Sequence, residues 1–119
     1  MLSDVFKIWE TTQERDSYLE FGYSCMGNEI PAAMGTRKAR KGGEVFTFVG
    51  DGTYLMNPTE LVTAMQEDLK VTVVVSENHG YQVIRQLQMF RVGRSFGNEF
   101  RARDGKADRL EGEYLNIDF

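Results

Sequence analysis

Two polar loops in the middle of the chain carry residue types that suit a divalent cation and a phosphate group. Gly50-Asp51-Gly52 follows one short apolar run, and Glu77-Asn78-His79-Gly80 follows another. Asp51 offers a carboxylate oxygen and Asn78 an amide oxygen. Mg²⁺ takes such oxygens, usually from one or two protein groups that act together with phosphate oxygens and water. The pattern predicts a metal-bridged diphosphate ligand; the alternative is a plain turn, which Asp-Gly forms more often after a strand.

The two loops meet only if the apolar runs before them form neighbouring strands. Residues 45–49 and 71–75 are β-favouring and nearly all apolar. Continuous rather than alternating apolar character is typical of parallel strands that are covered on both faces. Ligands of such sheets bind beyond the carboxyl ends of the strands. We therefore expect an α/β fold, a parallel sheet with helices on both faces, in which Asp51 and Asn78 lie within a few ångströms of each other.

A helix is predicted between the two strands. In Asn57-Pro58-Thr59-Glu60, asparagine suits the capping position, proline suits the first helical turn, and glutamate can close a capping box. Leu61, Met65 and Leu69 then recur at helical spacing and predict one buried face. Residues 45–75 therefore make one β-α-β unit, with the right-handed crossover that such units almost always have.

Outside this unit the sequence predicts a few further elements. One helix is expected to start near Pro31 and to end at Gly42-Gly43, and a short helix is expected over residues 83–88. Residues 1–20 are interpreted as a lead-in segment that can hold a short helix. Residues 91–113, which are rich in glycine and arginine, are interpreted as a loop. Residues 115–119 have the pattern of the start of a strand, so the fold is expected to be incomplete at the C-terminus.

Composition excludes several classes of protein. The 119 residues fit one domain at most, and a hydrophobic content of 41% supports a packed core. The net charge of -4 argues against nucleic-acid binding. A secretory signal and an apolar stretch of about 20 residues, long enough to cross a membrane, are both missing from the sequence. The single cysteine, Cys25, fits a reducing compartment, so a cytoplasmic location is expected. Basic side chains of the last third are expected to face solvent or an interface rather than a substrate: Arg85, Arg91, Arg94 and Arg101.

The two loops resemble the signature of the thiamine diphosphate (ThDP) enzymes, here Gly50-Asp51-Gly52 and, after residues 53–77, Asn78. The resemblance implies a diphosphate-binding domain with ThDP and Mg²⁺ as cofactors. It implies that Mg²⁺ is held by Asp51, Asn78 and the main-chain carbonyl of Gly80. It also places a further set of residues against the diphosphate: Gly50, Gly52, Thr53 and His79. Glu77 departs from the family pattern, which has two successive asparagines, but that position is not the metal ligand.

An upstream segment resembles the acetolactate synthase branch of the same family. It reads Gly22-Tyr23-Ser24-Cys25-Met26-Gly27 and continues with Ile30-Pro31-Ala32-Ala33-Met34-Gly35. The resemblance implies that the main-chain carbonyl of Ser24 meets the aminopyrimidine of ThDP and that Met26 supports the bent conformation of the cofactor. The alternative for Met26 is a gap-filling core residue. Cys25 is expected to be a small buried side chain rather than a nucleophile.

Within that branch, residues 16–103 resemble the trihydroxycyclohexane-1,2-dione hydrolase family of myo-inositol catabolism, and the similarity is carried by residues 19–27, 50–61 and 76–82. The resemblance implies ThDP-dependent hydrolytic cleavage of a C–C bond, which opens a small cyclic trihydroxy-1,2-diketone to a deoxy-hexuronic acid. It implies that residues 1–119 are part of the C-terminal diphosphate-binding domain. The activating glutamate of the family lies on a pyrimidine-binding domain, usually of a second subunit. The chain alone is therefore expected to be inactive, and His79 is its one candidate for proton transfer.

Two other functions stay open. One is an acetolactate synthase-like carboligase, which the loop at residues 77–81 disfavours because it is more similar to the hydrolase family. The other is a non-catalytic module that binds a phosphate ligand, in which Met26 would have no task at a thiazolium ring. Membrane partners and nucleic acids are not expected.

Overall fold

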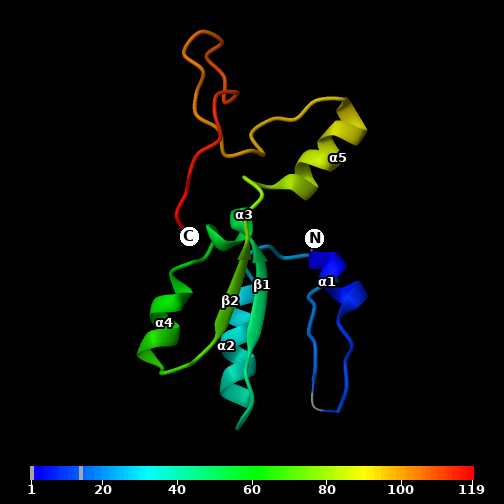
Figure 1. Cartoon of the computed structure of the whole chain (residues 1–119), viewed down its shortest axis with the longest axis vertical. Coiled ribbons are helices and arrows are strands. Elements are labelled where there is room, and N and C mark those ends of the chain that lie inside the picture. Colours follow the sequence, from blue (N-terminus) through cyan, green and yellow to red (C-terminus); the bar gives the residue numbers. More distant parts are fainter. Residues whose placement is uncertain (1, 14) are drawn as a thin grey trace.

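We describe the protein from a computed structural model, which covers residues 2–13 and 15–119, without the side chains of residues 2–4. Met1 and Glu14, both within the expected lead-in, lie outside the described residues. The helices and strands follow one another along the chain as Figure 1 labels them. They are α1 (Leu2–Ile8), α2 (Glu29–Ala39), β1 (Phe46–Gly50), α3 (Asp51–Tyr54), α4 (Glu60–Gln66), β2 (Thr72–Ser76) and α5 (Gln82–Val92).

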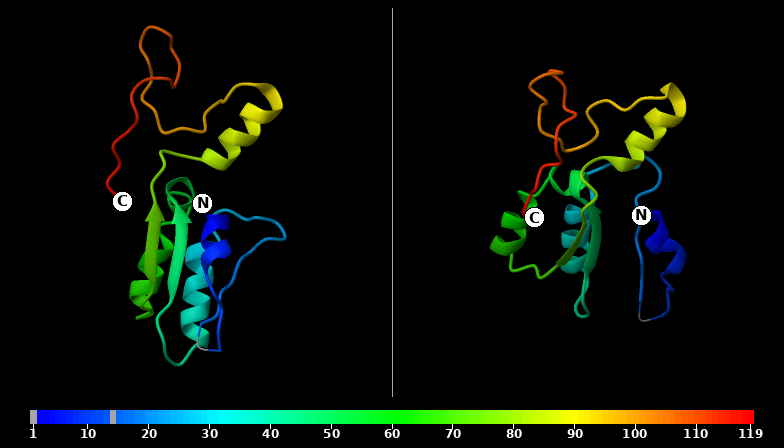
Figure 2. Two further views of the ribbon diagram at one scale, coloured as in Figure 1. Left: turned by 45° about the vertical axis from the view of Figure 1, so that its right-hand side comes forward. Right: turned by 45° about the horizontal axis from the view of Figure 1, so that its top comes forward.

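The expected β-α-β unit is confirmed. Strands β1 and β2 are parallel and pair in register from Phe46 opposite Thr72 to Gly50 opposite Ser76. Both strands therefore end at the same edge of the sheet. Helices α2 and α4 contact each other, and α2 packs against β1 (Figures 1 and 2). Their contact forms a small core of Ile30, Met34 and Ala64, with partly buried Tyr54, Leu61, Leu69 and Val73 around it.

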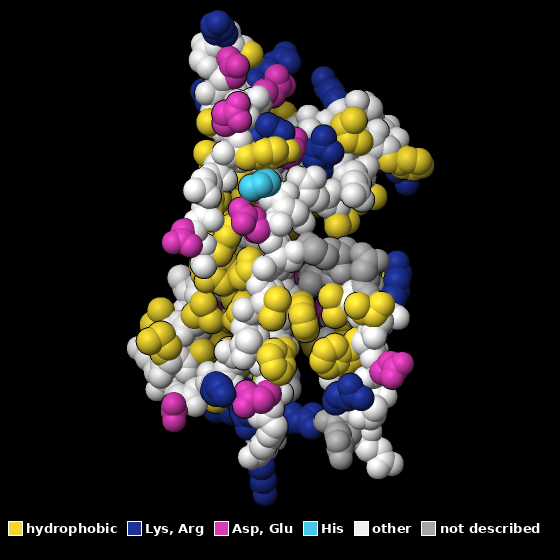
Figure 3. Space-filling view, in the orientation of Figure 1, with side chains coloured by type: hydrophobic (Ala, Val, Ile, Leu, Met, Phe, Trp, Pro, Cys, Tyr) yellow, Lys and Arg dark blue, Asp and Glu magenta, His cyan; other side chains and the backbone are white. Residues whose placement is uncertain are grey.

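Helices lie on both faces of the sheet, but the second face is only thinly covered. Helix α1 contacts β1 there, and just beyond it Trp9 packs edge-on against Phe48 with 6.3 Å between the ring centroids. Phe46 and Val74 remain exposed. In the orientation of Figures 1 and 3, α2 lies behind the strands and hydrophobic side chains gather on the near side. The prediction of strands buried on both faces is therefore wrong in part, because one short helix cannot cover two strands.

The predicted start of the helix between the strands is also wrong. Helix α4 begins at Glu60, and its N-cap residue, Thr59, makes no side-chain capping bond. The Thr59 hydroxyl instead donates to Asn57 Oδ1 at 3.3 Å. Asn57 is held in a turn at the end of α3, where its N–H donates to the carbonyl oxygen of Tyr54. The helix is therefore shorter than its apolar pattern suggests, and Met65, expected on the buried face, is 82% exposed.

The part of the chain after β2 differs most from the sequence-based expectation. Helix α5 runs to Val92, longer than the predicted short helix, and ends at Gly93, which adopts φ +70° as a left-handed C-cap. Residues 94–119 form an irregular arm that returns toward the strands (Figure 2). The strand expected at residues 115–119 is not formed. Leu115 N–H donates to the Phe100 carbonyl instead, and the Phe119 ring packs edge-on against Tyr54.

Within the described residues, the structure contains no helix that is both long enough and apolar enough to span a membrane.

Candidate functional site

Asp51 ties together the two loops at the carboxyl ends of the strands. It directly follows β1, and its side chain is fully buried, with 0% of the residue exposed. Its Oδ1 accepts a hydrogen bond from Gly52 N–H at 2.8 Å. Its Oδ2 accepts from Asn78 N–H at 3.1 Å and from Gly80 N–H at 2.9 Å. The predicted proximity of Asp51 and Asn78 is confirmed, and the contact is made by main-chain donors of the second loop.

Two further oxygen-bearing groups lie beside this carboxylate. The side-chain amide of Asn78 lies 3.2 Å from Asp51 Oδ1 and 2.8 Å from the carbonyl oxygen of Gly80. With its nitrogen turned inward, the amide donates to both oxygens; with its oxygen turned inward, the amide oxygen lies beside both of them. Octahedral Mg²⁺ with ligands at 2.0–2.1 Å places neighbouring ligand oxygens about 2.9 Å apart. The spacing and chemistry of the three groups therefore fit Mg²⁺.

The donor set also limits which metal chemistry is available. In the parts of the chain that the structure describes, no group of three His, Cys, Asp or Glu side chains could hold a metal ion. Asp51 supplies the one carboxylate, together with an amide and a main-chain carbonyl. Such a set leaves several coordination positions for phosphate oxygens and water, which is how Mg²⁺ is usually bound.

Two glycines allow close contacts of the loops, Gly52 with the second loop and Gly80 with the chain after α5. A Cβ on Gly52 would lie 2.6 Å from a ring carbon of Tyr81, and a Cβ on Gly80 would lie 2.3 Å from the main-chain oxygen of Asn98. Gly80 also adopts φ +128°, after His79 at φ +60°. Two successive residues with positive φ turn the loop sharply, so that both Asn78 N–H and Gly80 N–H reach Asp51.

The loop that carries Ser24 and Met26 is organised by Glu20. Its carboxylate accepts hydrogen bonds from Tyr23 N–H at 2.8 Å and Cys25 N–H at 2.7 Å. These main-chain donors lower the pKa of Glu20, and Ser24 N–H contributes in the same direction. Ser24 itself adopts φ +50°.

The same loop lies near the chain that follows α3. Gly27 is close to it, since a Cβ there would be 3.7 Å from Met56 Cβ. Met26 is 39% exposed, so the alternative of a core-filling methionine is not supported. The expectation that Cys25 is buried is wrong, because its side chain is exposed.

Of the remaining site residues predicted from the sequence, Gly50 and Thr53 lie within two residues of Asp51, and His79 lies in the second loop. Gly50 is the last residue of β1 and pairs with Ser76, and Thr53 lies in α3. His79 Nδ1 is 3.5 Å from Glu77 Oε1, and the His79 ring stacks on Tyr114 with 4.5 Å between centroids and 18° between planes.

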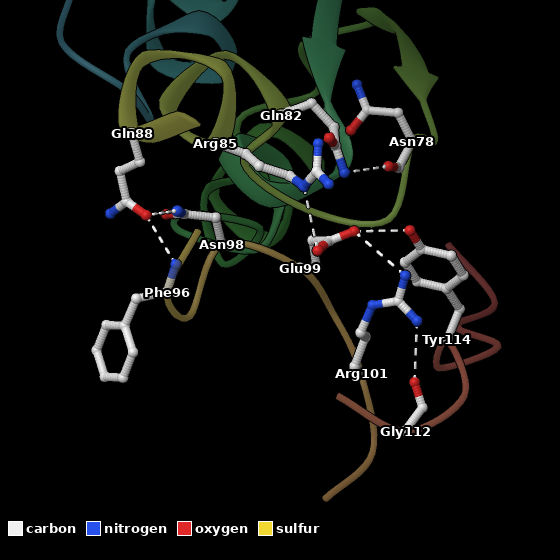
Figure 4. Close-up of polar contacts among 10 residues, drawn as sticks. All are labelled: Asn78, Gln82, Arg85, Gln88, Phe96, Asn98, Glu99, Arg101, Gly112 and Tyr114. Carbon is white, nitrogen blue, oxygen red and sulfur yellow. Dashed lines mark hydrogen bonds and ion pairs between the residues drawn. The ribbon is translucent and has the colours of Figure 1, made fainter. Parts of the chain in front are cut away.

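A cluster around Glu99 is the feature that sequence reasoning missed (Figure 4). Arg85 Nε lies 3.1 Å from Glu99 Oε2, and an Arg101 guanidinium nitrogen lies 3.4 Å from Glu99 Oε1. The Tyr114 hydroxyl donates to Glu99 Oε1 at 2.6 Å. This hydrogen bond, followed by Arg85 and Arg101, lowers the pKa of Glu99, and the same bond raises the pKa of Tyr114.

This cluster corrects the prediction for two of the four arginines. Arg85 and Arg101 are partly buried partners of Glu99, whereas Arg91 and Arg94 are exposed as expected. No local pattern predicts the roles of Glu99 and Tyr114, because both come from an irregular arm and meet their partners only in the folded chain.

Comparison with known proteins gives consistent matches. The family described as "Thiamine pyrophosphate enzyme, C-terminal TPP binding domain" matches residues 3–112. The chain is 40% identical over 116 residues to proteins named 3D-(3,5/4)-trihydroxycyclohexane-1,2-dione hydrolase from Clostridium tetani (strain Massachusetts / E88) and Bacillus thuringiensis (strain Al Hakam). Each match covers 98% of this chain and 18% of the relative, so the chain spans less than a fifth of the length of these relatives.

Proposed function

We propose that this chain, which belongs to the thiamine pyrophosphate enzymes as a C-terminal TPP binding domain, holds the diphosphate of ThDP through Mg²⁺. The observation that carries the proposal is the convergence of Asp51 Oδ1, the Asn78 amide and the Gly80 carbonyl at 2.8–3.2 Å. These three groups are the proposed metal ligands. Gly50, Gly52, Thr53 and His79 are the residues we propose to lie against the diphosphate.

The tasks of this chain in such an enzyme are binding and orientation. When bound, ThDP supplies a carbanion nucleophile and an electron sink for cleavage of a C–C bond next to a carbonyl. We propose that the carbonyl of Ser24 accepts a hydrogen bond from the aminopyrimidine and that the exposed Met26 side chain supports the cofactor from below. The loop that carries both residues lies near the chain that follows α3, and Asp51 is the first residue of α3.

For the whole protein we propose the reaction in the name of its relatives, hydrolytic opening of a small cyclic trihydroxy-1,2-diketone in inositol catabolism. The support is 40% identity over nearly the whole chain. We also propose a cytoplasmic oligomer in which a pyrimidine-binding domain of a second subunit supplies the activating glutamate. His79 is the only candidate for proton transfer that we propose within this chain.

Calorimetric titration of ThDP, with and without Mg²⁺, tests the cofactor site. We expect binding that depends on Mg²⁺ and that is lost in Asn78→Ala. This variant keeps the main-chain N–H bond to Asp51, so the loop stays folded. Asp51→Asn should also abolish binding, while Asp108→Asn, which changes an exposed aspartate of the arm, should not. Binding of equal strength without Mg²⁺, or in Asn78→Ala, would contradict the proposal.

Turnover tests the claim that the chain supplies only part of the active site. The purified chain with ThDP, Mg²⁺ and the cyclic dione should release no ring-opened acid, whereas a full-length relative under the same conditions should. Robust ring opening by the chain alone would show that the activating group lies within residues 1–119.

A further inference from the structure

The arm after α5 pairs with the metal loop, defined as residues 77–81. Tyr81 N–H donates to the carbonyl oxygen of Asn98 at 2.7 Å, and Phe100 N–H donates to the carbonyl oxygen of His79 at 2.9 Å. Gly80 and Glu99 face each other as an isolated antiparallel bridge between these two bonds. The turn that presents the Gly80 carbonyl is therefore backed by a short two-stranded pairing, and Gly80 has no space for a side chain on that side.

Glu99 anchors this pairing to the rest of the molecule. Its side chain is only 13% exposed and lies between Arg85 of α5 and Arg101 of the arm (Figure 4). A third partner, Tyr114, arrives from the end of the arm and donates to the same carboxylate at 2.6 Å. Tyr114 and Arg101 donate hydrogen bonds to Glu99, and Arg85 forms an ion pair with it although its Nε makes no hydrogen bond, so Glu99 is held from three directions.

Tyr114 provides a second connection from Glu99 to the metal loop. The Tyr114 ring stacks on the His79 ring with 4.5 Å between the centroids, and the Arg101 guanidinium carbon lies 3.6 Å from the centroid of the Tyr114 ring. His79 has φ +60°, a backbone conformation that residues other than glycine adopt only at a cost in energy. The stacked ring therefore restrains the one residue of the loop whose backbone resists the turn.

We propose that Glu99 and Tyr114 are positioning residues that hold the His79–Gly80 turn and thereby direct the Gly80 carbonyl toward Asp51 and Asn78. The two residues act through the main-chain pairing and through the His79 ring, and neither touches the metal. The part of the inference that concerns metal affinity rests on the proposed function; the part that concerns the turn does not. Residues that hydrogen-bond to the ligands of a metal influence metal affinity in this way, and their loss typically lowers that affinity roughly 10–100-fold.

The experiment uses the full 119-residue chain with three variants and one control. Glu99→Gln removes the charge, Tyr114→Phe removes the hydroxyl and keeps the ring, and Tyr114→Leu removes the ring. Arg103→Gln is the matched control, because it breaks an ion pair with Asp108 in the same arm whose side chains are 58% and 87% exposed. Far-UV circular dichroism checks that each variant folds.

Three measurements separate the turn from the metal. His79 is the only histidine, so its ring protons give one set of NMR signals that report the stacked tyrosine. Amide exchange at Gly80 reports the bond from its N–H to Asp51. The Mg²⁺ concentration that half-saturates ThDP binding reports the metal. We expect shifted His79 signals in Tyr114→Leu, faster Gly80 exchange in Glu99→Gln and Tyr114→Leu, and a roughly tenfold higher Mg²⁺ requirement in both. Tyr114→Phe should fall between these variants and the control.

The outcomes decide the two claims separately. Unchanged His79 signals and unchanged Gly80 exchange in Tyr114→Leu overturn the inference; if that variant does not fold, the Gly80 exchange of Tyr114→Phe decides. An equal change in Arg103→Gln overturns it as well, because the effect would then be a general loosening of the arm. If the unsubstituted chain binds no ThDP in an Mg²⁺-dependent manner, the proposed function fails, and the exchange data alone decide whether Glu99 and Tyr114 hold the turn.

Discussion

Asp51 shows how a single buried side chain can organise a binding site made from two loops. It lies one residue beyond β1, and it accepts hydrogen bonds from the loop after β2. A fully buried carboxylate must be compensated by hydrogen bonds, by a cation or by a metal ion. Here main-chain N–H groups of Gly52, Asn78 and Gly80 provide hydrogen bonds, while Oδ1 also faces the Asn78 amide. The same residue therefore has a structural task and a proposed metal-binding task.

Gly80→Ala tests whether the close contact at the metal loop is as tight as its geometry indicates. The new Cβ would lie 2.3 Å from the main-chain oxygen of Asn98, and a backbone atom cannot move aside cheaply. The positive φ of +128° adds strain for any residue with a side chain. We expect the free energy of unfolding to fall by roughly 2–4 kcal/mol, measured by urea denaturation. Gly105→Ala, where a Cβ meets open space, should change it by less than about 0.5 kcal/mol; equal effects would contradict the prediction.

Glu20 gives the loop around Ser24 and Met26 a dependence on pH. Main-chain donors lower its pKa below the ordinary value of 4.5. A carboxyl group with a lowered pKa stabilises the fold above its ordinary pKa, and this contribution is lost as the pH falls through the lowered value. The amide proton shifts of Tyr23 and Cys25 should therefore titrate together with a midpoint below pH 4.5. In Glu20→Gln this transition should vanish, and a midpoint above pH 4.5 would be inconsistent with the hydrogen bonds to Glu20.

At the scale of elements, the sequence predicts what local patterns determine. The strands are predicted to within one residue of their observed ends, because short runs of β-favouring apolar residues have few other solutions. Their parallel pairing then brings Asp51 and Asn78 together, so the centre of the candidate site follows from the same pattern. Met65 is misplaced because α4 contributes Ala64 and Leu61 to the core, so Met65, although it lies in the same helix, stays 82% exposed.

The arm explains why the rest of the site could not be predicted. Glu99 and Tyr114 lie in segments without regular secondary structure and with no apolar period. Their partners are His79, Arg85 and Arg101, and two of these three belong to other segments of the chain. Contacts of this kind depend on how an irregular segment folds back, which neither propensity nor hydrophobic spacing encodes.

Helix α2 offers a test at the element scale. Gly35 lies in its interior, it is exposed, and a Cβ there would meet nothing within 4 Å. Alanine has a higher helix propensity than glycine by about 1 kcal/mol. Gly35→Ala should therefore raise the free energy of unfolding by about 0.5–1 kcal/mol in urea denaturation. Gly93→Ala, at the left-handed C-cap of α5, should lower it instead; effects of the same sign would show that helix geometry is not the cause.

At the scale of the whole molecule, the chain is more extended than its length requires. The radius of gyration is 16.9 Å, whereas a compact domain of this length has about 13–14 Å. The arm and α5 lie beyond the ends of the strands and account for much of the extension (Figures 1 and 2). The buried apolar residues within the described part of the chain are few: Ile30, Ala33, Met34, Val45, Val49 and Ala64.

A small core combined with exposed apolar side chains predicts low thermal stability for the chain by itself. Burial of one large apolar side chain contributes about 1.5–3 kcal/mol, and four of the six core residues named above are the smaller alanine or valine. Phe90 and Phe96 of α5 and the arm are 82% and 85% exposed, so they contribute little.

We therefore expect differential scanning calorimetry of the isolated chain to show a broad transition with a midpoint below about 45 °C, the lower end of the range for mesophilic domains. An apolar dye such as ANS should bind before the transition, because apolar surface is already exposed in the folded chain. A full-length relative, in which the matching segment is 18% of the polypeptide, should melt at a higher temperature. A sharp transition above about 65 °C in the isolated chain, without dye binding, would mean that these side chains are covered in solution, by self-association or by a tighter fold of the arm.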